Sequence, residues 1–149
     1  MYIVKSKITD HIELTVLTKK SKAFWGYGSE QIKKWDRQLT ISKSYLSQNE
    51  VYKLVDNNRI IGYYSYIKIN KEKVKLDNIF ILPEFIGKKW GIYLMEDFFL
   101  RIKKTTALLV TLDSEPNAVN FYKKLGFKIV GQLESSIKNR FMPIMEIEL

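Results

Sequence analysis

The spacing of hydrophobic residues alternates along the chain between the period of a helix and that of a strand. Apolar positions three and four apart predict amphipathic helices at about 10–20, 29–39, 92–104 and 117–125. Alternating or continuous apolar runs predict strands at 1–7, 51–55, 59–69, 73–82, 107–112, 127–133 and 144–149. No internal repeat, low-complexity tract or linker separates these elements. We therefore predict one α+β domain over residues 1–149.

Turn residues divide the central strands. Asn57-Asn58 and Asn70-Lys71-Glu72 lie between them, and asparagine tolerates the positive φ of a tight turn. These turns predict an antiparallel meander. Ala107–Leu112 is continuously apolar, as in a strand buried on both faces. The last two predicted strands form an antiparallel pair, and their polar connection carries Lys138, Asn139 and Arg140.

The segment Leu76–Gly91 combines a strand, a proline, a basic loop with glycines and the start of a helix. Free backbone amides at a helix N-terminus favour phosphate. The loop is not a P-loop, because it lacks the second Gly-Lys-Ser/Thr element, and it lacks the three spaced glycines of a dinucleotide site. Alone, it fits a phosphate cradle and a plain surface turn equally well.

Composition narrows the chemistry. The chain has 149 residues, 46% hydrophobic, with a formal net charge of +9, no cysteine and one histidine, His11. Disulfides, thiolate catalysis and a multi-histidine metal site are therefore excluded. The charge favours a polyanion, which nucleic acid, an anionic membrane and a phosphorylated cofactor all satisfy. The sequence has no apolar run long enough to span a membrane and no signal-like leader. Its lack of cysteine makes a reducing cytoplasm the expected setting.

A family resemblance rests on the segment Asn117-Ala118-Val119-Asn120-Phe121-Tyr122-Lys123-Lys124-Leu125-Gly126-Phe127. This segment resembles the C-terminal signature of the GCN5-related N-acetyltransferase (GNAT) superfamily. Leu76–Gly91 is similar to the acetyl-CoA motif of that family, and the order of elements resembles it over the whole chain. Ser21–Tyr27 and Arg140–Met145 are also similar to segments of small bacterial members.

The loop departs from the family pattern Arg/Gln-x-x-Gly-x-Gly/Ala. Ile86 stands at its first position and Lys89 at its fourth, whereas Gly91 retains the sixth. Lys89 could crowd the pyrophosphate or replace backbone contacts with a charge-assisted one, and we favour the second. The asparagine that many members place seven residues before the tyrosine is Glu115 here, and Asn117 is the nearest substitute.

The resemblance implies a mostly antiparallel mixed sheet, flanked by helices and splayed between the strand ending near Leu82 and the strand starting near Ala107. It implies acetyl-CoA as co-substrate and no metal. Pantetheine would pair with the strand, and the amide of Ile81 would polarise the thioester carbonyl. The implied cofactor-binding residues are Ile79, Phe80, Ile81, Gly87, Lys88, Lys89, Trp90, Gly91, Ile92, Asn117, Tyr122 and Lys124.

Two residues are implied as catalytic. Tyr122 would protonate the departing thiolate, or else it packs against the sheet. Asp77 would act as the general base that an amine needs before attack, or else it is a solvated residue at a strand start. Glu50 and Asp36 are weaker candidates for the base. His11 reads better as a helix surface or core residue than as a catalyst.

The function implied is transfer of the acetyl group to a primary amine by direct attack in a ternary complex. Trp25 and Tyr27 either wall the substrate pocket or pack in the core. The expected partner is a small-molecule or protein amine, with a possible homodimer, no membrane, and nucleic acid unexpected. Alternatives are a non-catalytic acyl-CoA-binding regulator and, more weakly, a basic nucleic-acid-binding domain.

Overall fold

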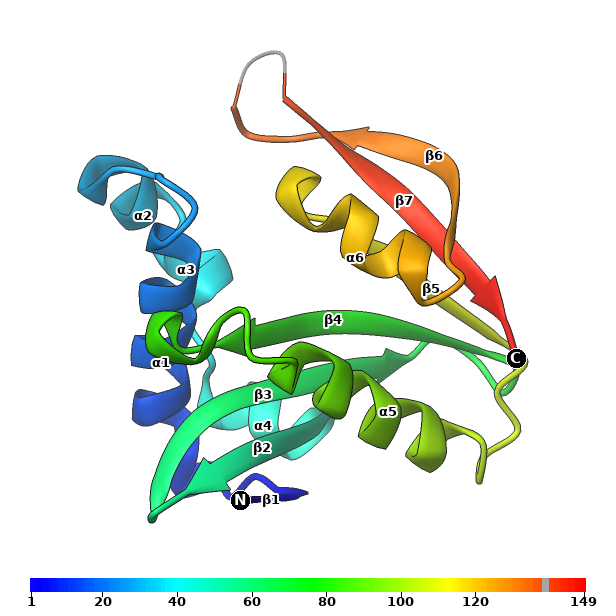
Figure 1. The fold of residues 1–149 in the computed structure, drawn as a ribbon, viewed down its shortest axis with the longest axis horizontal. Helices are drawn as coiled ribbons and strands as arrows, with labels where there is room; N and C mark the ends of the chain where they lie inside the picture. The colour runs from blue at the N-terminus through cyan, green and yellow to red at the C-terminus, as the bar shows by residue number, and fades with distance from the viewer. Residues whose placement is uncertain (138–139) are drawn as a thin grey trace. The chain divides into compact units, whose positions relative to one another are not determined.

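A computed structural model describes residues 1–137 and 140–149 (Figure 1). Lys138 and Asn139 of the predicted polar connection lie outside the described residues. The chain divides into two compact units, the first formed by Met1–Tyr66 with Asn78–Arg101 and the second by Ile67–Asp77 with Ile102–Leu149. The prediction that residues 1–149 act as a single domain stays a prediction.

Every predicted strand is present, but the strand expected at 107–112 to be buried on both faces is β5 (Leu109–Asp113), in which only alternate residues are buried. The strands are β1 (Tyr2–Lys5), β2 (Glu50–Asp56), β3 (Arg59–Lys68), β4 (Lys73–Ile81), β5 (Leu109–Asp113), β6 (Lys128–Glu134) and β7 (Phe141–Glu148). The α-helices are α1 (His11–Ala23), α2 (Ser29–Lys34), α3 (Asp36–Leu39), α4 (Lys43–Gln48), α5 (Trp90–Ile102) and α6 (Val119–Lys124). The 3-10 turns are η1 (Ile8–Asp10), η2 (Pro83–Phe85) and η3 (Pro116–Ala118).

The strands form one mixed sheet in the order β1-β2-β3-β4-β5-β7-β6. Neighbours pair antiparallel, as in β1 with β2 and β6 with β7, except that β4 and β5 are parallel from Lys73↔Leu109 to Lys75↔Thr111. Asn57 and Asn58 adopt positive φ of 49° and 61° between β2 and β3. The predicted meander and the mixed, mostly antiparallel sheet are therefore confirmed.

In the first unit, helices cover both faces of the strands (Figure 1). On one face, α5 buries Leu94, Met95 and Phe98 completely, and Phe98 packs edge-to-face against Tyr64 of β3. On the other face, α1 bonds to the sheet through Thr18, whose hydroxyl lies 2.6 Å from the hydroxyl of Tyr63. Alternation along β3 thus sends successive tyrosines to opposite faces.

Gly62 sets how closely these layers approach. A Cβ at this position would lie 3.1 Å from the carbonyl oxygen of Phe80 and 3.4 Å from the side chain of Leu94. At 3.1 Å the backbone of β4 would have to shift by a few tenths of an ångström to make room for a side chain, so glycine favours the close approach of β4 to β3 at this point.

A polar contact also ties α5 to the sheet. The hydroxyl of Tyr64, which is fully buried, donates to Asp97 Oδ2 at 2.7 Å, and Arg101 Nε donates to the same oxygen at 2.8 Å. The Arg101 guanidinium lies 4.0 Å from the centre of the Tyr52 ring. Burial, and next the bond to Asp97, raises the pKa of Tyr64, so its hydroxyl remains a donor.

The second unit has its own apolar centre. Val110, Leu112 and Met145 are almost fully buried, and α6 runs beside β7 (Figure 1). The carboxylate of Asp113, at the end of β5, pairs at 3.0 Å with Lys75 of the neighbouring strand β4.

The observed helices differ from the predicted ones in several places; α1, for example, continues to Ala23, three residues beyond its predicted end. The helix expected over 29–39 is interrupted at Trp35, whose φ of -90° and ψ of 9° separate α2 from α3. Helix α4 was missed; its Ser42 side chain accepts the backbone N–H of Tyr45 at 3.0 Å. Helix α5 begins and ends two residues earlier than predicted.

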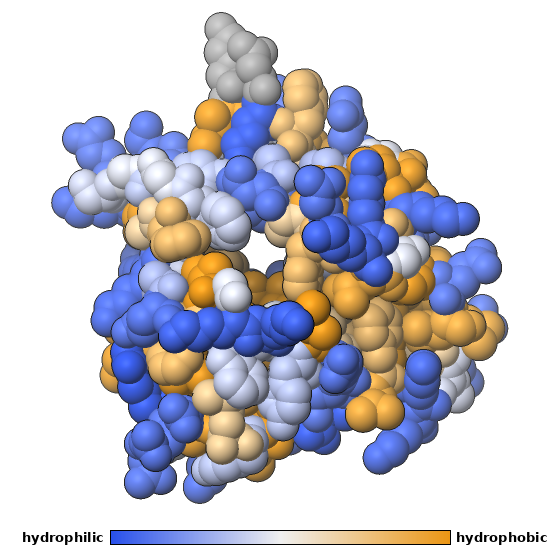
Figure 2. All heavy atoms as spheres, viewed as in Figure 1, coloured by the Kyte–Doolittle hydropathy of each residue, from blue (hydrophilic) through white to orange (hydrophobic). Residues whose placement is uncertain are grey.

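Hydrophilic and hydrophobic side chains are interspersed over the face that Figure 2 shows. Within the described part of the chain, no helix has the length and apolarity needed to span a membrane.

Candidate functional site

The loop between β4 and α5 has the backbone of a glycine-rich turn although it carries a lysine. Gly87 has a φ of 82° and Lys89 a φ of 67°, both in the left-handed region. The N–H of Tyr93 donates to the carbonyl of Lys89, so the helix starts directly after this residue. The position where the family pattern has glycine therefore keeps the conformation that glycine favours.

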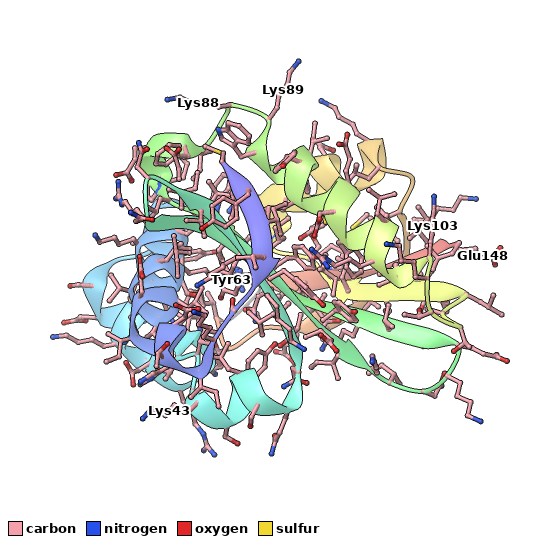
Figure 3. All side chains as sticks on the ribbon, turned by 90° about the horizontal axis from the view of Figure 1, so that it is seen from below. Lys43, Tyr63, Lys88, Lys89, Lys103 and Glu148 are labelled. Carbon is pink, nitrogen blue, oxygen red and sulfur yellow. The ribbon has the colours of Figure 1, made fainter. Side chains whose placement is uncertain are left out.

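Both lysines of this loop extend away from it at the start of α5 (Figure 3). The ammonium of Lys88 lies 5.7 Å from the centre of the Phe85 ring. The first turn of α5 contains no acidic residue. Helix amides and two ammonium groups thus present positive charge together, which suits a phosphate group.

The adjoining part of β4 exposes side chains on both faces, since Ile79, Phe80 and Ile81 are all half-buried. The N–H of Leu82 donates to the carbonyl of Ile61 on β3 at 2.8 Å. Successive backbone groups of a strand point to opposite edges, so the N–H of Ile81 points away from β3.

Tyr122 lies in the second unit, on α6. Its side chain is 7% exposed and packs edge-to-face against Phe121 and Phe127. Burial, and next the charge of Glu115, raises the pKa of Tyr122, so that its phenol is neutral at physiological pH.

Glu115 is held by neighbours on two sides. Arg140 donates to its Oε2 at 2.6 Å in a pair whose side chains are both 14% exposed, and Asn117 Nδ2 donates to its Oε1 at 3.0 Å. The segment that connects β5 to α6 is therefore fixed by charge-assisted bonds. Asn117 and Lys124 are themselves exposed.

The candidate bases are in different surroundings. Asp77 is half-buried and lies on the same face of β4 as Ile79 and Ile81, as predicted from alternation. Glu50 pairs with Lys5 at 3.2 Å, and Asp36 pairs with Lys19. His11 is half-buried and accepts a hydrogen bond from Thr15 through its carbonyl.

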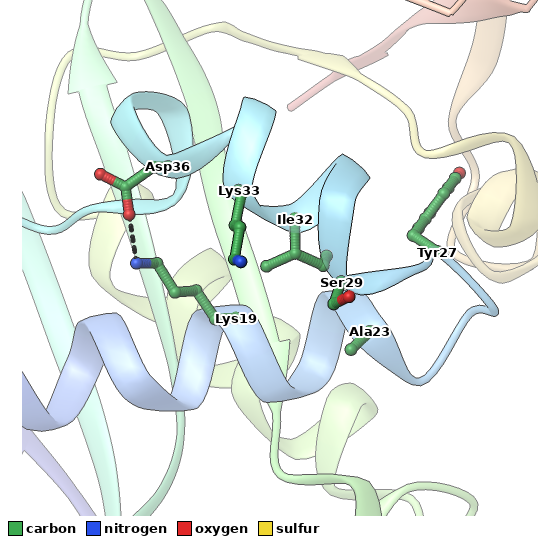
Figure 4. Close-up of a pocket in the computed structure, with 7 residues that line it drawn as sticks. All are labelled: Lys19, Ala23, Tyr27, Ser29, Ile32, Lys33 and Asp36. Atoms are coloured by element: carbon green, nitrogen blue, oxygen red, sulfur yellow. Dashed lines mark hydrogen bonds and ion pairs between the residues drawn. The ribbon is translucent and has the colours of Figure 1, made fainter.

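Tyr27 lines a hollow of about 400 Å³ between α1 and α2 (Figure 4). The side chains that line it are Lys19, Ala23, Tyr27, Ser29, Ile32, Lys33 and Asp36. The Tyr27 ring packs edge-to-face against Trp35, which is buried. Trp25 is 42% exposed and packs against Phe24, so of the two predicted residues only Tyr27 belongs to this hollow.

A polar cluster on β3, β4 and α4 was not predicted. Asn78 Nδ2 donates to Ser65 Oγ at 3.0 Å and to Tyr45 Oη at 3.3 Å, and these two hydroxyls lie 2.8 Å apart. The missed helix α4 carries Tyr45, and no motif marks an asparagine inside a strand. We call Tyr45, Ser65 and Asn78 the Asn78 cluster.

Comparison of the sequence with models of known families identifies the family of this chain. Residues 18–149 match the sequence model of the family described as "Acetyltransferase (GNAT) domain". The chain belongs to this family. The predicted superfamily and fold class are thereby confirmed, and the predicted enzyme class, an acyltransferase, is that of the family.

Solved structures agree in fold. The PaiA N-acetyltransferase of Thermoplasma acidophilum, in complex with coenzyme A, superposes with a TM-score of 0.82 at 24% identity and 100% coverage of both chains. The ribosomal-protein-S18-alanine N-acetyltransferase of Escherichia coli gives 0.76 at 16% identity, covering 99% of this chain and 92% of the other.

The similarity to curated relatives extends over only part of each chain. The uncharacterized N-acetyltransferase ycf52 of Pyropia yezoensis is 24% identical over 60% of this chain, and that of Gracilaria tenuistipitata var. liui is 26% identical over the same share. The chain spans about half the length of these relatives, 52% and 50%.

Among the described residues, no group of three or more His, Cys, Asp or Glu side chains is placed to hold a metal ion.

Proposed function

We propose that the protein transfers the acetyl group of acetyl-CoA to a primary amine. The observation that carries this proposal is the loop after β4, which keeps left-handed backbone at Gly87 and Lys89 in a chain of the GNAT family. Lys88 and Lys89 add charge to the amides of Gly87–Ile92 for the pyrophosphate. The whole chain 1–149 would act as one domain.

The strand next to this loop would bind the pantetheine arm. The backbone of Ile79–Ile81 offers polar groups at the edge away from β3, as in the addition of a strand to a sheet. The N–H of Ile81 would polarise the thioester carbonyl, because a fixed donor stabilises the charge that develops on that oxygen.

The reaction needs two proton transfers. The amine nitrogen attacks the carbonyl carbon, the carbon–sulfur bond breaks, and an amide and free thiol are formed. Asp77 would accept the proton of the amine, directly or through water, and Tyr122 would give a proton to the sulfur. Burial raises the pKa of Tyr122, so its phenol keeps its proton at neutral pH and this proton would be available to the departing sulfur as the bond breaks.

The acceptor is an amine of a small molecule or of a protein. Tyr27 and the hollow between α1 and α2 would form part of its approach, on the evidence of an apolar wall with a polar rim. The absence of cysteine from the sequence favours a cytoplasmic setting. A homodimer is compatible with these proposals.

The proposal is tested by two measurements on the full chain. Acetyl-CoA at a hundredfold excess over its dissociation constant should stabilise the protein by about 2.7 kcal/mol, and thiol release should follow with at least one amine of a broad panel. Lys89→Glu should weaken binding of acetyl-CoA, whereas Lys43→Glu, on the exposed surface of α4, should not.

Binding without thiol release for any amine would favour the acyl-CoA-binding regulator, which the exchange of glycine for Lys89 makes a specific alternative. A shift in melting temperature with DNA and none with acetyl-CoA would overturn the proposal.

A further inference from the structure

Two aromatic side chains lie on the first turn of α5, directly after the loop proposed for the pyrophosphate. The ring centres of Trp90 and Tyr93 are 5.6 Å apart, and the rings stand edge-to-face at 84°. Residues three apart are neighbours on the surface of a helix. The helix itself therefore holds this aromatic pair together.

The pair lies outside the apolar contact between α5 and the sheet. Leu94, Met95 and Phe98 form the sheet-facing side of the helix and are fully buried. With 3.6 residues per turn, Tyr93 falls on the opposite side, where it is 39% exposed, and Trp90 is half-buried. The ring of Tyr93 thus offers a flat apolar surface that a ligand can reach.

The positive charges of the loop adjoin this surface. The N–H of Tyr93 donates to the carbonyl of Lys89 at 3.2 Å, so the two residues are one helical turn apart. The side chains of Lys88 and Lys89 extend outward at the start of α5 (Figure 3). A ligand that spans the loop and this turn would meet ammonium groups and backbone amides first, and then an aromatic ring.

Acetyl-CoA, the proposed co-substrate, presents its own groups in a matching order. Its diphosphate is joined through a single ribose to an adenine ring. Every nucleic-acid base has a π-face, so stacking on an aromatic side chain requires no hydrogen bond to the base. Anionic phosphates followed by a flat base fit ammonium groups followed by a ring.

We propose that Tyr93, with Trp90 packed against it, is the platform on which the adenine of acetyl-CoA stacks. The inference rests on the proposed function, since it takes the loop after β4 as the site of the pyrophosphate. Trp90 restrains the Tyr93 ring by edge-to-face packing. A ring that is already ordered loses less entropy when a ligand binds.

This platform determines which acyl donors the protein prefers. Coenzyme A consists of 4′-phosphopantetheine joined to a phosphorylated adenosine, and thioesters of 4′-phosphopantetheine alone have no base to stack. Specificity is a difference between two affinities, and stacking strengthens the binding of the CoA thioester only. Tyr93 is therefore a specificity-determining residue for the donor and has no contact with the reacting atoms.

The test compares CoA with 4′-phosphopantetheine on the full chain by calorimetry, with a displacement titration for the weaker ligand. Tyr93→Ala should weaken CoA binding about five- to fiftyfold, the effect of removing an aromatic ring from beneath a base. Its affinity for 4′-phosphopantetheine should change less than about twofold. Tyr93→Phe keeps the ring and should bind both ligands as the unaltered protein does.

Leu100→Ala is the matched control. Leu100 follows Tyr93 by two helical turns on the same outer side of α5 and is 63% exposed. Its truncation should alter neither affinity, because it lies far from the loop along the helix. Melting temperatures identify any variant that folds poorly, and the ratio of the two affinities still reports stacking in such a variant, since a loss of folded protein affects both ligands equally.

The outcomes separate this inference from the proposed function. Equal losses for both ligands in Tyr93→Ala, or an unchanged affinity for CoA, would overturn the platform and leave the proposed function standing. The platform would also be overturned if Tyr93→Phe bound CoA as weakly as Tyr93→Ala. Failure of the unaltered protein to bind CoA at all would overturn the proposed function and this inference with it.

Discussion

Lys89 has a backbone conformation that lysine seldom adopts, with a φ of 67°. A left-handed residue other than glycine costs roughly 1–2 kcal/mol. Contacts of the surrounding chain must offset this cost. The N–H of Tyr93, in the helix that begins at Trp90, donates to the Lys89 carbonyl, and Gly87 reverses the chain just before Lys89. Lys89 therefore lowers the stability of the fold, but it places a positive charge where we propose that phosphate binds.

Substitutions of Lys89 distinguish the effect of backbone strain on stability from the effect of its charge on acetyl-CoA binding. Lys89→Gly should raise the free energy of unfolding by about 0.5–1 kcal/mol, the relief of strain less the entropy that glycine gains in the unfolded chain. It should also weaken acetyl-CoA binding about tenfold through the lost charge-assisted contact. Denaturant unfolding and calorimetry measure the two effects.

Two controls sharpen this prediction. Lys89→Gln keeps the strain and removes the charge, so it should weaken binding without stabilising the fold. Lys88→Gly has no positive φ to relieve and should lower stability by about 0.4–1 kcal/mol. Equal stability of Lys89→Gly and the unaltered protein would show that the strain of the left-handed backbone does not exceed the entropy that glycine gains in the unfolded chain.

The hydroxyl of Tyr122 can be removed without loss of its ring. Because the side chain is buried among Phe121 and Phe127, Tyr122→Phe should fold normally and bind acetyl-CoA with nearly the same affinity. Turnover should fall about 10²- to 10⁴-fold if the phenol is a general acid. Steady-state kinetics with thiol detection would show this, and unchanged turnover would restrict Tyr122 to packing.

At the scale of elements, the contact between α5 and β3 combines apolar packing with a buried donor. The Tyr64 hydroxyl has Asp97 as its partner, and Asp97 also receives Arg101 from the next turn of the helix. A buried donor that loses its partner retains its full desolvation cost. The two sides of this bond should therefore respond unequally to substitution.

Asp97→Ala should lower the free energy of unfolding by about 2 kcal/mol, because it leaves the Tyr64 hydroxyl buried without an acceptor. Tyr64→Phe should cost less, about 1 kcal/mol, since Asp97 is partly exposed and keeps Arg101. Urea unfolding of both variants measures the difference, and the reverse order would contradict the assignment of the buried partner.

Sequence patterns predicted elements well wherever apolar periodicity was strong. The meander followed from Asn57-Asn58, and the order of β4, loop and α5 followed from Leu76–Gly91. Helix α4 was missed because six mostly polar residues, of which only Leu46 is buried, carry no amphipathic stripe. For the same reason its Tyr45 could not be brought to Asn78, which depends on tertiary contacts that no local pattern encodes.

At the scale of the whole molecule, several phenols share one electrostatic property. Burial is the leading cause that raises the pKa of four tyrosines, namely Tyr52, Tyr64, Tyr66 and Tyr122. The folded state therefore keeps protons that the unfolded chain loses near pH 10. Stability from this source is complete below pH 10 and declines as the pH rises above it.

The effect of a single tyrosine on the free energy of unfolding can be measured at Tyr66, because burial raises its pKa to about 12. Between pH 10 and 12 the unaltered protein should lose about 1.4 kcal/mol per pH unit more than Tyr66→Phe for this single group. Urea unfolding at pH 8, 10 and 11 gives the two curves. Parallel curves would show that Tyr66 ionises alike in both states.

The loop after β4 has one further consequence for experiments. Lys88 and Lys89 are adjacent, exposed and oriented outward, and exposed loops are preferred sites of proteolytic nicking. Trypsin therefore finds a dibasic target at the place proposed for the pyrophosphate. Limited digestion followed by mass spectrometry would report occupancy of this loop directly, without a label, an acceptor amine or turnover.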